Sequence, residues 1–324
     1  MKRLLIVTLA ACGNDAAKSA DAAIDVAIPD AIPDALLDAP AAPANAHRYV
    51  IDHELMPTNN NLARMYALDL DNSGQVDNQL GMVVAAFSSM GFDVQAPMDH
   101  AIDTGATIML ADVESATLTG GAATFTLFQG SNAMPAPCSG ASDTTCRHHL
   151  AGTATFDVAA TSPHDPPLPG TITGGVLDAG PGTLHLTTTI FGAPLSLQLI
   201  GTRVRWTQPT DSVLMTGVID GGIPTSELHT TVYPAMQTAI TAQIALDCTA
   251  LASPPQCGCA AGSTGKTDID LFDTNHDCAV TVDELEASSL LQSLLASDVT
   301  IDNQPAVSFG VGISAVHAAF VPPT

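Results

Sequence analysis

Apolar and polar residues alternate along much of the chain, and this alternation is the pattern of half-buried strands. It is clearest over residues 183–190, where leucine and isoleucine fall on one face and threonine and histidine on the other. Leu195, Leu197 and Leu199 resume the alternation after a Gly-Ala-Pro turn, so the two segments predict a hairpin. The alternation slips at Gly201, which indicates a bulge.

Further strands are predicted on both sides of this hairpin, separated by turn-forming Gly, Pro, Ser and Asp residues. Together the predicted strands are 48–55, 107–117, 123–129, 148–159, 171–177, 183–190, 195–199, 213–219 and 307–320, with a change of register near Ala315 in the last. Many short strands with frequent turns favour an antiparallel sandwich or barrel-like sheet over alternating strands and helices. We therefore expect an α+β, β-rich fold class.

A repeat of about four residues marks the predicted helices. The first carries Leu80, Val83, Val84 and Phe87 on one face and ends at Gly91. The others are a short helix over 97–105, a long one over 225–248, an entry helix with Ile269 and Phe272, and a leucine-rich exit helix over 285–295. Because the last strand is expected to pair back into the sheet, we expect 225–297 to be a helical insertion within a single domain, 47–324. Two separate domains are the alternative.

The charge balance narrows the classes of partner. The chain has 33 acidic and nine basic residues among 324, a formal net charge of −24. Nucleic-acid binding requires clustered Lys and Arg against phosphates, so nucleic acid is not an expected partner. An acidic surface suits cations, although acidity also serves solubility alone.

The N-terminus has the pattern of an export sequence. Lys2 and Arg3 precede a short apolar run, too short to span a bilayer, that ends in Leu9-Ala10-Ala11-Cys12. This segment resembles a bacterial lipobox. The resemblance implies a signal peptide at 1–11, lipid on the thiol of Cys12 and attachment to a membrane of the cell envelope, inner or outer. An ordinary cleaved secretory signal is the alternative.

Residues 12–46 are rich in Ala, Asp and Pro. Mutual repulsion of the aspartates and stiffening by the prolines predict an extended, solvated tether that buries no core. Tethers of this composition after a lipobox resemble those of myxobacterial-type lipoproteins.

Six cysteines follow Cys12, an even number typical of disulfides in an exported chain. Cys138 and Cys146 bracket a short polar loop and are expected to pair with each other. The remaining four are Cys248, Cys257, Cys259 and Cys278. A metal cluster at Cys257 and Cys259 is the alternative, although zinc sites normally space their cysteines as CxxC.

Residues 273–284 place oxygen-bearing side chains at the spacing by which one loop wraps a hard cation. Positions 1, 3, 5, 9 and 12 are Asp273, Asn275, Asp277, Thr281 and Glu284, and the carbonyl of Ala279 stands at position 7. The segment resembles an EF-hand loop, and the resemblance implies calcium. A polar loop that only caps the following helix is the alternative.

Position 6 of such a loop is normally Gly, because the backbone there has positive φ, but here it is Cys278. A non-glycine residue in that conformation costs about 1–2 kcal/mol. We expect a disulfide from Cys278 to Cys257 or Cys259 to help hold the turn. A strained loop without a partner EF-hand predicts weak affinity, with a Kd of about 10⁻⁴–10⁻³ M, and a structural role.

A second segment resembles the Asp-rich loops of thrombospondin type 3-like repeats more than a full EF-hand. Its ligand positions are Asp69, Asp71, Ser73, the carbonyl of Gln75, and Asp77, with Gly74 at the tight turn. Position 12 is Leu80, so the bidentate glutamate is missing. The alternative is a solvated turn that caps the next helix.

Other local motifs point to no chemistry. Residues 260–267 match a relaxed phosphate-binding pattern, but a cysteine-rich turn precedes them instead of a buried strand, and Ser263 or Thr264 more simply caps the entry helix. His148 and His149 would point to opposite faces of a strand and could not share a metal, which leaves a solvated strand end. Neither HExxH nor GxSxG occurs in the sequence.

These observations favour a calcium-binding, non-catalytic envelope lipoprotein. Its disulfide-stabilised β-rich domain would be displayed on the tether as a binding or structural module with a protein or glycan partner. The alternative is an exported hydrolase whose site is assembled from distant loops and leaves no local motif.

Overall fold

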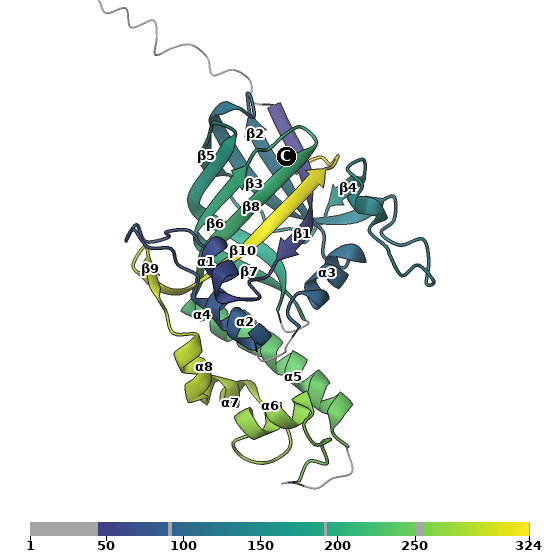
Figure 1. Ribbon diagram of the computed structural model, residues 1–324, viewed down its shortest axis with the longest axis vertical. Coiled ribbons are helices and arrows are strands. Elements are labelled where there is room, and N and C mark those ends of the chain that lie inside the picture. Colours follow the sequence, from purple (N-terminus) through teal and green to yellow (C-terminus); the bar gives the residue numbers. More distant parts are fainter. Residues whose placement is uncertain (1–44, 90–92, 191–192, 250–253, 255, 324) are drawn as a thin grey trace, which may run out of the picture. The chain divides into compact units, whose positions relative to one another are not determined.

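Antiparallel strands form a ten-stranded sheet that returns to its starting strand (Figure 1). This computed structural model describes residues 45–89, 93–190, 193–249, 254 and 256–323. The order is β1-β2-β3-β5-β6-β7-β8-β10, and β10 pairs again with β1. β9 pairs with β10 and β4 with β3, outside this ring. The sheet therefore follows the barrel-like alternative, and the α+β, β-rich prediction is confirmed.

The strands in chain order are β1 Asn45–Leu55, β2 Met109–Ser115, β3 Gly120–Met134, β4 Thr155–Val158, β5 Leu168–Thr173, β6 Val176–Ile190, β7 Ala193–Thr207, β8 Val213–Pro224, β9 Val299–Ile301 and β10 Gln304–His317. The predicted hairpin is β6–β7, with Leu186 opposite Leu197. Both predicted irregularities are present. The β7–β8 register shifts between Ile200 and Arg203, and the β10–β8 register shifts between Ile313 and Ala315.

The helices are α1 Asn60–Met65, α2 Gln79–Ser89, α3 Ala96–Asp103, α4 Thr225–Glu227, α5 Tyr233–Asp247, α6 Thr264–Phe272, α7 Val282–Ala287 and α8 Ser289–Leu294. A π-helical turn, Leu228–Val232, joins α4 to α5 immediately before Pro234, which sits at the start of α5. Helices α5 to α8 gather beyond one end of the sheet, between β8 and β9 in the sequence (Figure 1). In α5, Met236 is buried, and the predicted stripe continues through the partly buried Ile240 and Ile244.

Three predicted elements are wrong in detail. The strand over 171–177 is in fact the end of β5, a turn at Gly174 and Gly175 with positive φ, and the start of β6. The strand over 148–159 begins as a 3-10 helix, His148–Leu150, and only Thr155–Val158 is extended. The exit helix is broken at Ser288, whose extended ψ of 115° separates α7 from α8.

The core is formed by the alternating apolar faces of the strands. Trp206 and Phe125 are fully buried, and their rings meet edge to face with centroids 5.0 Å apart. The indole covers Gly217, its partner on β8. Buried aromatic pairs of this kind contribute much of a core's stability.

The outer face of β10 carries small residues, and these admit the segment from α1 to α2. A Cβ at Gly312 would lie 2.5 Å from the ring of Tyr66, and one at Gly310 would lie 2.0 Å from the Tyr66 carbonyl oxygen. The glycines therefore allow the α1–α2 connection, which carries the first Asp-rich loop, to lie directly on the sheet.

The described residues from 45 to 323 belong to one compact unit. The predictions for the lipobox, Cys12 and the tether up to residue 44 lie outside the described residues. Within the described part of the chain, no helix has the length and apolar character needed to cross a membrane.

Candidate metal centres

The loop from Asp69 to Asp77 is anchored at both ends. The N–H of Asp77 donates to the carbonyl of Leu68 over 2.9 Å, which closes the loop. The N–H of Leu68 donates to Oδ2 of Asp220 on β8 over 2.6 Å, which ties the loop to the sheet. Gly74 has a φ of 83°, as position 6 of a cation-binding loop requires.

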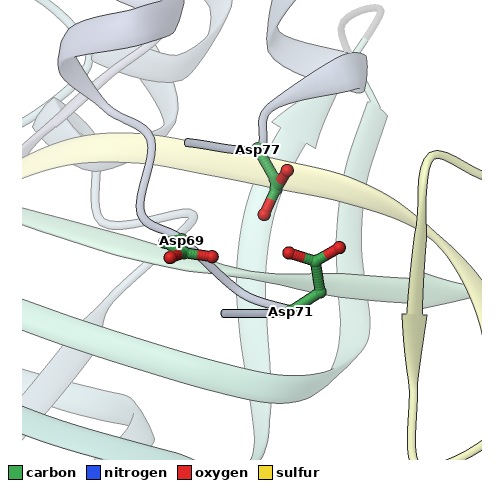
Figure 2. Close-up of side chains that lie close together, drawn as sticks. All are labelled: Asp69, Asp71 and Asp77. Carbon is green, nitrogen blue, oxygen red and sulfur yellow. The ribbon is translucent and has the colours of Figure 1, made fainter. Parts of the chain in front are cut away.

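Asp69, Asp71 and Asp77 turn their carboxylates toward one another (Figure 2). Each offers an oxygen within 4.8 Å of the others, a separation that one ion can bridge. The N–H of Ser73 donates to Oδ1 of both Asp69 and Asp71, and the N–H of Gly74 donates to Oδ2 of Asp69. Backbone donors inside the loop therefore fix the orientation of these carboxylates.

The cluster concentrates negative charge in a partly buried place. Burial raises the pKa of Asp77, and the charges of Asp71, Asp298 and Asp69 raise it further. Hydrogen bonds from Ser73 lower the pKa of the exposed Asp71. A divalent cation would relieve this repulsion, since an opposite charge favours the ionised form of each carboxyl group.

Two residues that anchor the loop were missed in the sequence. Asp220 is fully buried, its Oδ1 has no hydrogen-bond partner among the described residues, and burial raises its pKa well above the ordinary value. Asn78 exchanges two hydrogen bonds with the backbone of Gly310 and accepts from the N–H of Gly81 at the start of α2. The helix is thus capped by Asn78 and not by the Asp-rich loop. A charged residue inside an otherwise apolar strand was the available indication of Asp220.

Position 12 of this loop supplies no ligand. Leu80 lies in the first turn of α2 and is 2% exposed, so its side chain belongs to the core. Asp298 lies near enough to influence the pKa of Asp77, but it is not part of the close trio, and its carboxylate accepts hydrogen bonds from the N–H and the hydroxyl of Ser308. The loop therefore offers five ligating groups, at positions 1, 3, 5, 7 and 9.

The 273–284 loop has the internal hydrogen bonds expected of a cation-binding turn. Asp273 accepts from the N–H of Asp277 and of Cys278, at 3.1 and 2.9 Å. Oδ1 of Asn275 accepts from the N–H of Asp277 at 2.8 Å. Oδ1 of Asp277 accepts from the N–H of Ala279 at 3.0 Å. The loop side chains are thus turned inward by the backbone.

Both carboxylate oxygens of Glu284 accept hydrogen bonds from nearby threonines. Its Oε2 accepts from the N–H and hydroxyl of Thr281, and the Thr281 hydroxyl accepts from the N–H of Glu284, a capping box at the start of α7. Its Oε1 accepts from the N–H and hydroxyl of Thr274. Among the described residues, the 69–77 carboxylates form the one acidic trio with mutually close oxygens, and Asp273, Asp277 and Glu284 do not gather in that way.

A disulfide holds the turn of the 273–284 loop, and two others lie elsewhere in the chain. Cys278 has a φ of 72° and is bonded to Cys257, one of the two partners expected for it. Cys248 is bonded to Cys259 and Cys138 to Cys146, the latter as predicted. The alternative of a metal cluster at Cys257 and Cys259 is wrong, because the two sulfurs belong to different disulfides.

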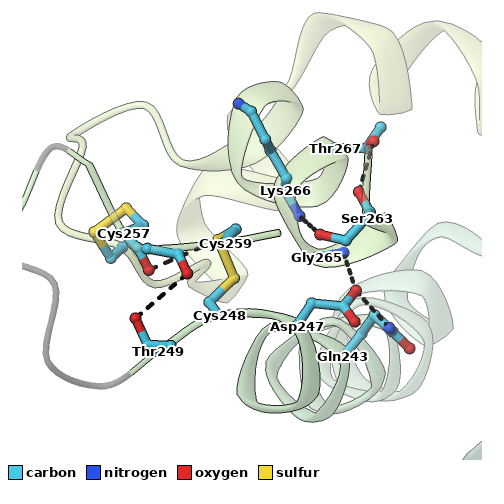
Figure 3. The surroundings of a disulfide bond; sticks show 12 residues. Gln243, Asp247, Cys248, Thr249, Cys257, Cys259, Ser263, Gly265, Lys266 and Thr267 are labelled. Atoms are coloured by element: carbon cyan, nitrogen blue, oxygen red, sulfur yellow. Dashed lines mark hydrogen bonds between the residues drawn. A yellow bond between two sulfur atoms is a disulfide. The ribbon is translucent and has the colours of Figure 1, made fainter. Parts of the chain in front are cut away.

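The region between α5 and α6 is a structural junction (Figure 3). Oδ2 of Asp247 accepts from the N–H of Gly265 at 2.8 Å and from the amide of Gln243 at 2.7 Å. Ser263 caps α6 by accepting from the N–H of Lys266, whose Nζ pairs with Asp270. The resemblance of 260–267 to a phosphate loop is therefore explained by a helix cap.

The adjacent histidines do not lie on a strand. His149 is fully buried and packs edge to face on Phe156, while His148 contacts Asp143 at 2.8 Å. The expectation of a solvated strand end is wrong for His149, because the 3-10 turn directs it into the core.

Two Ser–His–Asp contacts bear on the hydrolase alternative. In one, Ser139 Oγ and Asp143 Oδ2 lie 3.0 and 2.8 Å from the same ring nitrogen, Nε2 of His148. In the other, Ser314 Oγ and Asp52 Oδ2 lie 3.2 and 3.1 Å from the same ring nitrogen, Nδ1 of His53. The other ring nitrogen of His53 faces Arg147 at 3.3 Å. A catalytic relay requires the serine and the aspartate on opposite ring nitrogens, so neither arrangement fits one.

Comparison of the chain with protein-family models, with curated proteins and with solved structures returns no match.

Proposed function

We propose that this chain is a non-catalytic, calcium-binding protein of the bacterial cell envelope, in which calcium stabilises the loops that border a closed β-rich sheet. The observation that carries the proposal is the convergence of Asp69, Asp71 and Asp77, whose carboxylate oxygens lie within 4.8 Å of one another. Hard oxygen ligands in a flexible loop are typical of calcium sites. The ion would be a structural component and would fasten the α1–α2 connection to the sheet.

The 273–284 loop supports a second site. Its spacing and internal hydrogen bonds match a cation-binding turn, but Glu284 is engaged at the start of α7. Binding there would require Glu284 to exchange hydrogen bonds for the ion. We therefore expect the 69–77 loop to bind the more tightly of the two, which reverses the order expected from the sequence.

Isothermal titration calorimetry with calcium tests each loop separately. We expect two sites in the oxidised protein, with Kd values of about 10⁻⁴–10⁻³ M. Asp71→Asn should abolish the tighter one and Glu284→Gln the other. Asp302→Asn removes an exposed carboxylate outside both loops and should leave both sites intact. Binding of calcium to Asp71→Asn with unchanged affinity would show that the cluster is not a site.

Thermal unfolding provides an independent measure. A ligand that binds only the folded state at 100 times its Kd adds about 2.7 kcal/mol to the free energy of unfolding. We expect the Tm to fall by several degrees when chelator replaces calcium, under oxidising and reducing conditions alike. An unchanged Tm in chelator would remove the structural role.

Attachment to the envelope is supported by the lipobox-like sequence that ends at Cys12. More than one acyl chain on a residue gives stable membrane association, whereas one chain is marginal. In a bacterial host, the full chain should fractionate with membranes and incorporate labelled fatty acid, and Cys12→Ser should abolish both. Label retained by Cys12→Ser would refute lipidation at this residue.

A further inference from the structure

A groove of about 650 Å³ lies beside the 69–77 loop. One wall is formed by the loop, including Leu68, Asp69 and Val76, and the other by β5, β6 and β7. Val76 is apolar yet 52% exposed, and small residues such as Gly170 and Ala179 leave space between the walls. A volume of this size accommodates a small molecule.

The groove holds an unusual share of the protein's positive charge. Of the six Arg and Lys residues in the described part of the chain, Arg203 and Arg205 both line it. Nη2 of Arg203 donates to Oδ1 of Asn72, which ties the Asp-rich loop to β7 at 2.9 Å. Arg205 is 55% exposed and uses Nε to bind Asp178 at 2.6 Å. Its terminal N–H groups make no hydrogen bond among the described residues and remain available to a ligand.

Because position 12 of the loop supplies no ligand, an ion bound there would keep an open coordination position. Calcium takes six to eight oxygen ligands, and the loop offers five ligating groups because Leu80 is buried in the core. With one oxygen from each group, at least one position on the ion is left for water or a ligand from outside the loop. Asp69 belongs both to the carboxylate trio and to the groove wall, so the candidate ion site and the groove share a boundary.

The balance of charged residues around the groove determines which ligands could bind in it. Without an ion, Asp69, Asp71, Asp77, Asp178 and the nearby Asp298 outnumber the two arginines, and an anion would be repelled. One calcium ion offsets two of these three excess negative charges. Binding of an anion in the groove should therefore depend on calcium.

We propose that calcium in the 69–77 loop and the guanidinium groups of Arg203 and Arg205 together bind a carboxylate-bearing sugar in this groove. The inference rests on the calcium binding proposed above. The carboxylate completes the coordination of the ion and pairs with Arg205, a geometry that guanidinium groups favour. The exposed Val76 offers an apolar surface to the face of a sugar ring.

Isothermal titration with trigalacturonate tests the proposal on the oxidised protein. In saturating calcium we expect binding that disappears in chelator and in Asp71→Asn. Arg205→Gln should weaken it about tenfold while calcium affinity stays unchanged. Arg64→Gln removes an exposed arginine at the end of α1 and should bind trigalacturonate as the wild type does. Galactotriose, which lacks the carboxylates, should not bind.

The outcomes separate this inference from the function on which it rests. Failure of calcium itself to bind the loop would remove both. Calcium binding without trigalacturonate binding, or equal binding by Arg205→Gln, would overturn the sugar site alone. Equal competition by inorganic phosphate would overturn the assignment to carboxylates, because it would show a site for oxyanions in general.

Discussion

Cys257 is disulfide-bonded to Cys278, and Cys278 stands with a φ of 72° at the position of the 273–284 loop where glycine is normal. The bond closes a loop with a sequence separation of 21, which in the chain-entropy model stabilises the fold by about 3 kcal/mol. The crosslink thus offsets the backbone cost of a side chain in a left-handed turn, about 1–2 kcal/mol.

These two effects can be separated by mutation. Cys257→Ser breaks the crosslink and leaves Cys278 in its strained conformation, so it should lower the free energy of unfolding by about 2–4 kcal/mol. Adding Cys278→Gly should restore about 1 kcal/mol, because glycine adopts positive φ freely. Urea unfolding in calcium-free buffer measures both. Equal stability of the single and double variants would mean that the turn is not strained.

Glu54 should make stability fall with rising pH. The side chain is fully buried, its Oε1 accepts from Thr188 at 2.6 Å, and its Oε2 has no partner among the described residues. Burial raises its pKa to about 8 from 4.5. Between those values the folded chain keeps a proton that the unfolded chain loses, so the free energy of unfolding decreases by roughly 1.4 kcal/mol per pH unit.

Glu54→Gln removes this ionisation and keeps an acceptor for Thr188. The variant should therefore show a flatter dependence of unfolding free energy on pH between 4.5 and about 8, and it should be more stable than the wild type at pH 8. Glu114→Gln, at an exposed position on β2, is the matched control and should follow the wild-type curve. Parallel curves for Glu54→Gln and the wild type would contradict a protonated Glu54.

His149 should make the protein less stable at acidic pH. It is fully buried, and burial lowers the pKa of its imidazole below 6.5. The unfolded chain therefore binds a proton that the folded chain excludes, and stability is lost as pH falls below about 6.5. His149→Phe should reduce that loss in urea unfolding between pH 6.5 and 4.5, whereas His100→Gln, at an exposed position in α3, should not. An undiminished acid loss in His149→Phe would place its origin elsewhere.

The packing of Trp206 on Gly217 predicts a strict requirement for glycine. A Cβ at Gly217 would lie 1.5 Å from the indole, so Gly217→Ala should destabilise the protein by about 3 kcal/mol through overpacking. At Gly120 the nearest atom to an added Cβ is 3.6 Å away, and Gly120→Ala should cost less than about 1 kcal/mol. Trp206 is the only tryptophan, so its fluorescence in urea follows unfolding directly. Equal stability of the two variants would contradict this packing.

The parts of the fold that could be predicted from sequence are those with local causes. The β6–β7 hairpin follows from alternation of buried leucines with polar residues, and the cap at Ser263 follows from its own helix. The turn at Gly174 and Gly175 was not predicted because the alternation of residues continues across it, although two glycines with positive φ form a tight hairpin turn. Local periodicity also did not predict the 3-10 helix that begins at His148, after a disulfide-closed loop.

In the candidate sites too, local features could be predicted from the sequence and long-range contacts could not. The ligand spacing of both loops is a local property and was visible in the sequence. The anchoring of the first loop depends on Asp220, which is 152 residues from its partner Leu68, and on Asn78, which is 232 residues from Gly310. No single sequence shows such pairings, because they arise only when the sheet brings distant strands together.

The strand β10 pairs with β1, β8 and β9, so the pairing of three other strands is incomplete until β10 has been synthesised. During synthesis, before Gln304–His317 is available, the edges of β1 and β8 would remain unpaired, and exposed strand edges promote aggregation. Folding must therefore end with an event of long sequence separation, which makes it slow relative to helical proteins of similar size. Until β10 pairs with β1 and β8, aggregation of the partly folded chain therefore competes with folding.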